Sequence, residues 1–153
     1  MRHNRPRNEG FEPGAVIGPL IDMKAVEKVE AHIADAVKKG AKVVLGGKRA
    51  AQGGRFFEPT VLTDVTTDMV ITKEETFGPV GPLYRFKSED EAVKMANDTE
   101  FGLASYFYSR DIGRIWRVAE ALEYGIVGIN EENISAGAPS TGNRQPDEGA
   151  PIR

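Results

Sequence analysis

Cysteine is absent from the 153 residues of this sequence. Its absence excludes disulfides, thiolate metal ligands and a cysteine nucleophile within these residues. Long apolar runs are also missing, because no stretch approaches the roughly 18 residues of a membrane-spanning helix. No signal peptide is visible after Met1. The sequence therefore predicts a cytosolic protein without a membrane partner.

The sequence also lacks a strong excess of charge of either sign. Lys and Arg number 20 and Asp and Glu number 23, which gives a net charge of −3. A balanced surface of this kind argues against binding nucleic acid through bulk charge. The two histidines, His3 and His32, are far apart in the sequence, so no metal site is predicted. We interpret His32 as a residue at the boundary of an apolar helix face.

Helical and extended patterns alternate along the chain, whose length suits one domain. Predicted helices follow Asp22, Ser88 and Asp111, and predicted strands cover residues 42–45, 56–65, 80–86, 103–108 and 126–129. Such alternation is typical of an α/β fold with a largely parallel sheet covered by helices. Residues 1–7 are predicted to be a disordered head, and residues 131–153 a divergent, disordered tail.

Apolar spacing predicts which side of each element is buried. In the first helix the buried stripe is formed by Val26, Val29, Ile33 and Val37, and in the last by Ile112, Ile115, Trp116, Ala119 and Leu122. The strand at residues 42–45 (KVVL) is expected to be buried, since it is almost wholly apolar. The glycine pairs at residues 46–47 and 53–54 lack the spacing of a phosphate-binding loop and predict turns of a hairpin instead.

The segment at residues 74–79 (EETFGP) stands out as a candidate site. A carboxylate at Glu75 could accept hydrogen bonds from the hydroxyls of a ligand, and Phe77 could pack on a flat ring. The alternative is a surface acid next to a phenylalanine of the core. The adjacent acids Glu74 and Glu75 are weak evidence for acid–base catalysis, which needs opposed positions across a cleft.

Four segments of the chain together resemble the aldehyde dehydrogenase superfamily. They are residues 18–22 (GPLID), 58–62 (EPTVL), 74–79 (EETFGP) and 96–104 (ANDTEFGLA), in the order and spacing of that family. Residues 106–111 (YFYSRD) and 114–125 (RIWRVAEALEYG) are most similar to the succinate-semialdehyde dehydrogenase branch. The likeness covers about residues 8–130 and corresponds to the later part of the catalytic domain.

The resemblance implies roles for three residues. Glu75 matches the glutamate that binds the nicotinamide-side ribose of NAD or NADP, and Phe77 matches the aromatic residue beside it. Ser135 is a weaker match to a serine that helps hold the substrate carboxylate. The family's catalytic cysteine, general-base glutamate and dinucleotide-binding domain have no counterpart in this sequence, so no catalytic residue is assigned. We therefore expect weak or absent cofactor binding and no activity from this chain alone.

The resemblance leaves three functional readings open. The first is a truncated aldehyde dehydrogenase-like oxidoreductase that is inactive by itself. The second is a non-catalytic module that associates with itself or with a full-length homologue through an exposed sheet edge. The third is a repurposed pocket with binding or hydrolase activity, which no motif supports, since the chain has no G-x-S-x-G sequence.

Overall fold

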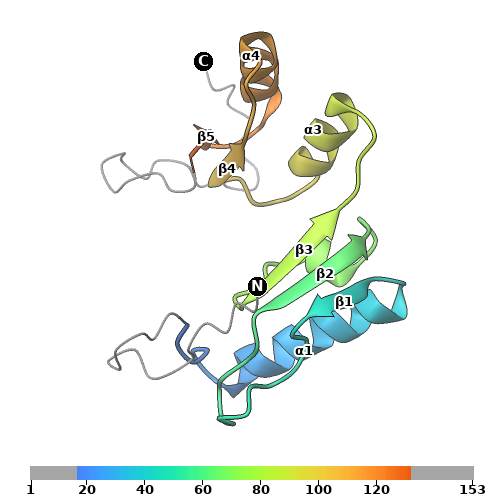
Figure 1. Ribbon diagram of the computed structural model, residues 1–153, viewed down its shortest axis with the longest axis vertical. Coiled ribbons are helices and arrows are strands. Elements are labelled where there is room, and N and C mark those ends of the chain that lie inside the picture. The colour runs from blue at the N-terminus through green and yellow to red at the C-terminus, as the bar shows by residue number, and fades with distance from the viewer. Residues whose placement is uncertain (1–16, 132–153) are drawn as a thin grey trace. The chain divides into compact units, whose positions relative to one another are not determined.

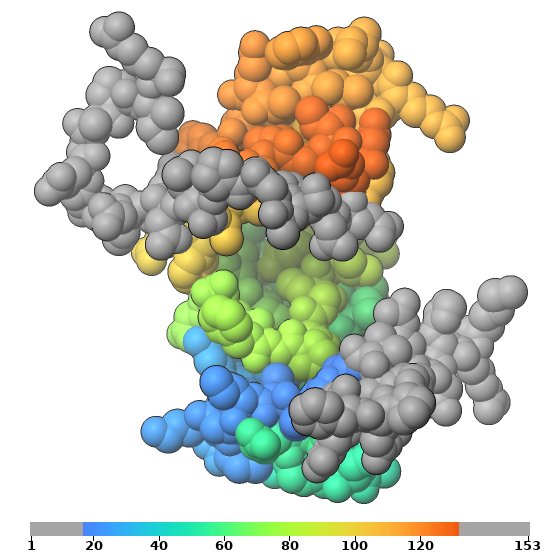
Figure 2. All heavy atoms as spheres, turned by 90° about the vertical axis from the view of Figure 1, so that its left-hand side faces the viewer, coloured from blue at the N-terminus to red at the C-terminus, as the bar shows by residue number. Residues whose placement is uncertain are grey.

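The computed structural model describes residues 17–131, which form two compact units that meet in sequence at Arg85 and Phe86 (Figure 1). The first unit contains α1 (Met23–Lys38), β1 (Lys42–Leu45), β2 (Thr60–Val65), α2 (Val70–Lys73) and β3 (Val80–Tyr84). The second contains α3 (Glu89–Asn97), β4 (Ala104–Phe107), α4 (Ile112–Ala121) and β5 (Ile126–Ile129). Figure 2 shows the heavy atoms of both units, coloured along the chain. Ser135 and the predicted head lie outside the described residues, as does nearly all of the predicted tail.

Each unit has a sheet of its own, a division that the sequence did not predict. In the first unit the strand order is β1-β2-β3, with β1 antiparallel and β3 parallel to β2. In the second unit β4 and β5 are parallel, and Ala104 lies opposite Ile126. The α/β class with largely parallel pairing is therefore confirmed, and the hairpin of β1 and β2 is its antiparallel part. Among residues 17–131, no helix has the length and apolarity needed to cross a membrane.

Helix α1 provides one side of the core of the first unit (Figure 1). Its first turn is capped by Asp22, whose carboxylate accepts a hydrogen bond of 2.7 Å from the backbone N–H of Ala25. The core consists of Val26, Val29, Ile33, Ala36, Ala41, Phe57, Leu62, Val65, Met69 and Ile71. The predicted stripe is correct except at its end. Val37 is exposed, and Ala36, three residues after Ile33, takes the buried position.

Strand β1 is exposed along its whole length, so the prediction of a buried strand is wrong. Val44 and Leu45 are 59% and 56% exposed. The physical reason is that β1 is the edge strand of this sheet and pairs only with β2 among the described strands. The turn prediction for the glycines holds. Gly46 and Gly47 have φ values of 67° and 85° in the connection between the two antiparallel strands, and neither begins a helix.

The helices of the second unit begin at the predicted caps but bury less. Ser88 accepts a hydrogen bond from the N–H of Glu91, and Asp111 accepts one from the N–H of Arg114. In the described part of this unit no apolar side chain is fully buried. Trp116 is 64% exposed, Ile112 is exposed too, and the other three residues of the predicted stripe are only partly buried, so the prediction of a buried stripe on α4 is wrong.

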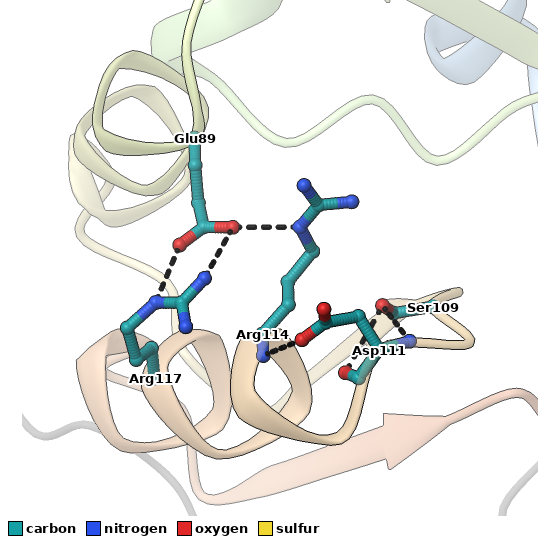
Figure 3. A network of polar contacts seen from close by, with 5 residues as sticks. All are labelled: Glu89, Ser109, Asp111, Arg114 and Arg117. Atoms are coloured by element: carbon teal, nitrogen blue, oxygen red, sulfur yellow. Dashed lines mark hydrogen bonds and ion pairs between the residues drawn. The ribbon is translucent and has the colours of Figure 1, made fainter.

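Polar contacts connect α3 with α4 in place of a buried core (Figure 3). Glu89, the first residue of α3, accepts hydrogen bonds from Arg114 Nε at 2.8 Å and Arg117 Nε at 3.1 Å. These bonds, that of Arg117 first, lower the pKa of the Glu89 carboxyl below its usual value. The hydroxyl of Ser109 accepts a hydrogen bond from the N–H of Asp111 just before α4.

Candidate functional site

The candidate segment, residues 74–79, connects α2 to β3 within the first unit. Glu74 ends α2 in an extended conformation, with φ −112° and ψ 138°. At the other end, the carbonyl of Pro79 accepts a hydrogen bond of 2.7 Å from the N–H of Thr60, the first residue of β2. The segment is thus fixed at its end by the central strand of the sheet.

Side chains of α1 hold the beginning of the segment. Glu74 forms an ion pair with Lys28 Nζ at 3.3 Å, and its carboxylate also lies 3.4 Å from His32 Nε2. Hydrogen bonding, from Lys28 first and His32 second, lowers the pKa of the Glu74 carboxyl. The other ring nitrogen of His32, Nδ1, lies 2.6 Å from the hydroxyl of Thr76. Lys28 and His32, about one helical turn apart on α1, therefore contact the residues directly before and after Glu75.

His32 is only 3% exposed, so its interpretation as a boundary residue is wrong. The physical reason is that Thr76 and Glu74 supply polar partners for both ring nitrogens, which offsets the cost of removing an imidazole from water. The only sequence signal for this arrangement is the four-residue spacing of Lys28 and His32, which places both on one face of the helix.

Gly78 allows the segment to approach α1 closely. A Cβ atom at this position would lie 2.4 Å from Cγ2 of Val29, a buried core residue. Any larger residue must displace either the helix or the segment, because a well-packed interior has no room to absorb the overlap. The glycine of the EETFGP sequence is therefore needed for packing at this position.

Glu75 and Phe77 lie beside a small surface hollow of about 60 Å³, which is also lined by Ala25, Lys28, Val29 and Thr76. Phe77 is 75% exposed, and Glu75 is exposed as well. The alternative that placed a phenylalanine in the core is thus wrong for Phe77. The residues that line the hollow include Glu75, whose carboxylate can accept hydrogen bonds, and Phe77, whose aromatic ring is exposed. These are groups that can bind a hydroxylated ligand with a flat ring.

The adjacent acids do not form a catalytic pair. Glu74 is bound to Lys28 and His32, whereas Glu75 lines the hollow. Residues 17–131 contain no group of three His, Asp or Glu side chains that could hold a metal ion. Helix α1 adds Ala25, Lys28 and Val29 to the lining of the site, and the sequence alone does not indicate that role for any of them.

The family model described as the aldehyde dehydrogenase family matches residues 3–149. The chain belongs to the aldehyde dehydrogenase family. It is 65% identical over 126 residues to a glutarate-semialdehyde dehydrogenase of Pseudomonas aeruginosa, and 62% identical over 127 residues to an NADP(+) succinate-semialdehyde dehydrogenase of Escherichia coli. These alignments cover 82% and 83% of this chain but only 26% of each relative. The chain thus spans about a quarter of the length of the curated relatives it matches.

Solved structures of the family have the same fold over the aligned part. The succinate-semialdehyde dehydrogenase of Burkholderia pseudomallei has a TM-score of 0.86 at 64% identity and aligns with 90% of this chain and 29% of its own. A betaine aldehyde dehydrogenase of Staphylococcus aureus in complex with NAD+ has a TM-score of 0.83 at 39% identity, over 92% of this chain and 29% of its own. The resemblance to the succinate-semialdehyde branch is thereby confirmed, and the chain corresponds to a fragment of these enzymes.

Proposed function

We propose that this chain supplies the nicotinamide-ribose contact of a succinate-semialdehyde dehydrogenase-type oxidoreductase. The observation that carries the proposal is the exposure of Glu75 and Phe77 beside one hollow, next to Lys28 of α1. The Glu75 carboxylate would accept hydrogen bonds from the ribose hydroxyls, and the Phe77 ring would pack against the cofactor. NAD or NADP is the group that fits. When bound, it supplies a hydride acceptor.

The names of the relatives support a class of substrate. They act on glutarate semialdehyde, 3-sulfolactaldehyde and succinate semialdehyde, each of which has an aldehyde and an anionic group. We therefore propose a short aldehyde with a distal carboxylate or sulfonate for the assembled enzyme. Ser135 is the residue of this chain proposed to contact that anionic group.

The 153 residues by themselves are proposed to be inactive towards aldehydes. Oxidation through a thiohemiacetal needs a thiolate nucleophile, and this sequence contains no cysteine. The test is to incubate the purified chain with succinic semialdehyde and either NAD or NADP. No reduced cofactor above a buffer blank is expected. Turnover that copurifies with the chain and disappears in Glu75→Ala would overturn the proposal.

Cofactor affinity of the chain alone is expected to be weak. A charge-assisted hydrogen bond contributes about 1.5–3 kcal/mol and an aromatic contact about 0.5–1.5 kcal/mol. Their sum of about 2–4.5 kcal/mol corresponds at best to a dissociation constant near 1 mM, before the cost of ordering is subtracted. Saturable binding at micromolar NAD or NADP in a calorimetric titration would contradict this expectation.

The ribose contact itself can be tested by NMR at millimolar cofactor concentration. We expect the backbone signals of Glu75 and Phe77 to shift on addition of NAD or NADP. Glu75→Ala should abolish the shifts, whereas Glu120→Ala, which removes an exposed carboxylate from α4, should leave them unchanged. Shifts confined to residues away from the hollow, or no shifts at all, would reject the assigned role.

Self-association is a second proposal, supported by the apolar side chains at the surface. In the first unit these include Val44 and Leu45 on the edge strand β1, and in the second unit Ile112 and Trp116 on α4. Exposed apolar surface and an edge strand both favour contact with another chain, either a second copy or a full-length homologue in the cytosol. Light scattering at high protein concentration should show a dimer or larger species. A monomer under these conditions would contradict the proposal.

A further inference from the structure

His32 is a buried histidine that does not line the hollow, so it takes no direct part in the proposed ribose contact. It lies on α1, and both of its ring nitrogens face the candidate segment rather than the hollow. Nδ1 contacts Thr76 Oγ1 at 2.6 Å, and Nε2 contacts Glu74 Oε2 at 3.4 Å. The partners of one side chain therefore bracket Glu75 in the sequence, and Thr76 also directly precedes Phe77.

The chemistry of the Glu74 contact determines which ring nitrogen must carry a proton. An ionised carboxylate only accepts hydrogen bonds, so Nε2, which faces Glu74, must carry a proton. In the neutral ring Nδ1 then has a free lone pair and accepts the proton of the Thr76 hydroxyl. A ring protonated on Nε2 alone satisfies both contacts, and so does a ring protonated on both nitrogens, whose Nδ1–H would donate to Thr76 Oγ1, so in either form the buried ring has no unpaired nitrogen.

We infer that His32 is a positioning residue: it fixes the backbone from which Glu75 and Phe77 project into the hollow. The inference rests on the proposed function for the roles of these two residues. The other contact from α1 is that of Lys28 with Glu74, in which both side chains are about half exposed. Exposed ion pairs hold a side chain only weakly, since water competes for both groups. The buried imidazole is the stronger constraint on the segment.

The sharpest test removes the hydroxyl of Thr76, because this leaves α1 and its core contacts intact. Thr76→Val preserves the branched shape of the side chain, and Thr76→Ser restores the hydroxyl. The readout is the amide hydrogen exchange of Gly78, whose N–H donates to the carbonyl of Thr76 at 2.9 Å. We expect exchange about tenfold faster in Thr76→Val and near the unaltered rate in Thr76→Ser, with the amide of Leu62 in β2 unchanged.

A second readout concerns the imidazole itself. Nitrogen chemical shifts of the unaltered chain should show a proton on Nε2 of His32, the nitrogen that faces Glu74. His32→Asn, whose amide can reach the position of Nδ1, should slow Gly78 exchange relative to His32→Ala. Thr67→Val, the same substitution at an exposed threonine, serves as the control for Thr76→Val. Unchanged Gly78 exchange in Thr76→Val, or an Nε2 without a proton, would overturn the inference.

Failure of the ribose contact can be recognised separately. If NAD and NADP shift no signals of Glu75 and Phe77 in the unaltered chain, the proposed function is rejected, while the exchange rates still decide whether His32 orders the segment. If cofactor does shift these signals, Thr76→Val should reduce the shifts and Thr76→Ser should retain them. Equal shifts in both variants would contradict positioning without touching the ribose assignment.

Discussion

The two units of this chain are stabilised in different ways. The first has a core of fully buried side chains between α1 and its sheet, among them Val26, Val29 and Leu62. The described residues of the second, 86–131, include no fully buried apolar side chain, and its helices are connected through Glu89 and two arginines (Figure 3). Buried apolar area contributes about 25 cal/mol per Å², whereas an exposed ion pair contributes about 0–1 kcal/mol. The first unit should therefore be the more stable.

This difference matters for function because the candidate site belongs wholly to the first unit. The hollow is formed by α1 and residues 75–77, and the buried His32 contacts the hydroxyl of Thr76. A binding site on a rigid scaffold loses less entropy when it is occupied. The weaker second unit, with its exposed Trp116, provides apolar surface that a partner could cover.

The largest expected effect on stability comes from removing a buried side chain from the core of the first unit. Leu62→Ala removes a fully buried side chain from the first unit and should lower its free energy of unfolding by about 2–5 kcal/mol. Leu122→Ala, at a half-buried position of the second unit, should cost about 1 kcal/mol, since less apolar area is lost. Urea titration followed by amide signals of β2 and of β5 measures each unit separately. Equal losses would contradict the contrast.

Two glycines offer a sharper test, because the same substitution creates a similar overlap in each unit. An added Cβ would lie 2.4 Å from Val29 at Gly78 and 2.5 Å from the ring of Tyr106 at Gly128. Val29 is buried in the core, whereas Tyr106 is exposed and its ring can rotate away. Gly78→Ala should therefore lower the free energy of unfolding by about 1–3 kcal/mol, and Gly128→Ala should lower it by less.

The control for this pair is Gly18→Ala, where an added Cβ would meet nothing within 4 Å. Chemical denaturation of the three variants gives the comparison directly. A cost for Gly128→Ala as large as that for Gly78→Ala would show that the second unit is packed as rigidly as the first.

Helix caps give the next smaller effect. Asp22 accepts a 2.7 Å hydrogen bond at the start of α1, and Asp111 accepts a 2.6 Å bond at the start of α4. Asp22→Ala and Asp111→Ala should each lower the free energy of unfolding by about 1 kcal/mol. The buried face of α1 should keep that helix formed, whereas α4 should fray. Circular dichroism and amide exchange in the first turns would detect this difference, and equal fraying would contradict it.

Local features of the fold could be predicted from the sequence because their causes are local. Asp22, Ser88 and Asp111 each bind an N–H three residues later, so a short stretch of sequence contains both partners. Burial was predicted less well. The apolar run of β1 and the side chains of Ile112 and Trp116 suit a buried environment, but their exposure depends on which other elements pack against them.

In the candidate site, too, some residues could be predicted from the sequence and others could not. Glu75 and Phe77 belong to one short motif and could be predicted from the sequence alone. Lys28 was missed because its partner, Glu74, is distant in the sequence, and His32 lies 44 positions before Thr76. No periodicity within α1 shows which distant loop a polar side chain will contact. The fold brings these residues together through the parallel pairing of β2 and β3, whose connection includes the candidate segment.

The smallest effect is the pH dependence of the link between α3 and α4. The hydrogen bonds of Arg117 and Arg114 lower the pKa of Glu89 in the folded chain, so the carboxylate stabilises the second unit at pH values above the unfolded pKa of about 4.3. This contribution is lost as the pH falls through the lower folded pKa. Glu89→Gln should therefore reduce the difference in stability of the second unit between pH 6 and pH 3, and high salt should reduce it in the unaltered chain. Glu30→Gln, which removes the partner of Arg49 in the first unit, is the matched variant. It should change the pH dependence of the first unit alone, and an identical response of both units to either substitution would show that they unfold as one.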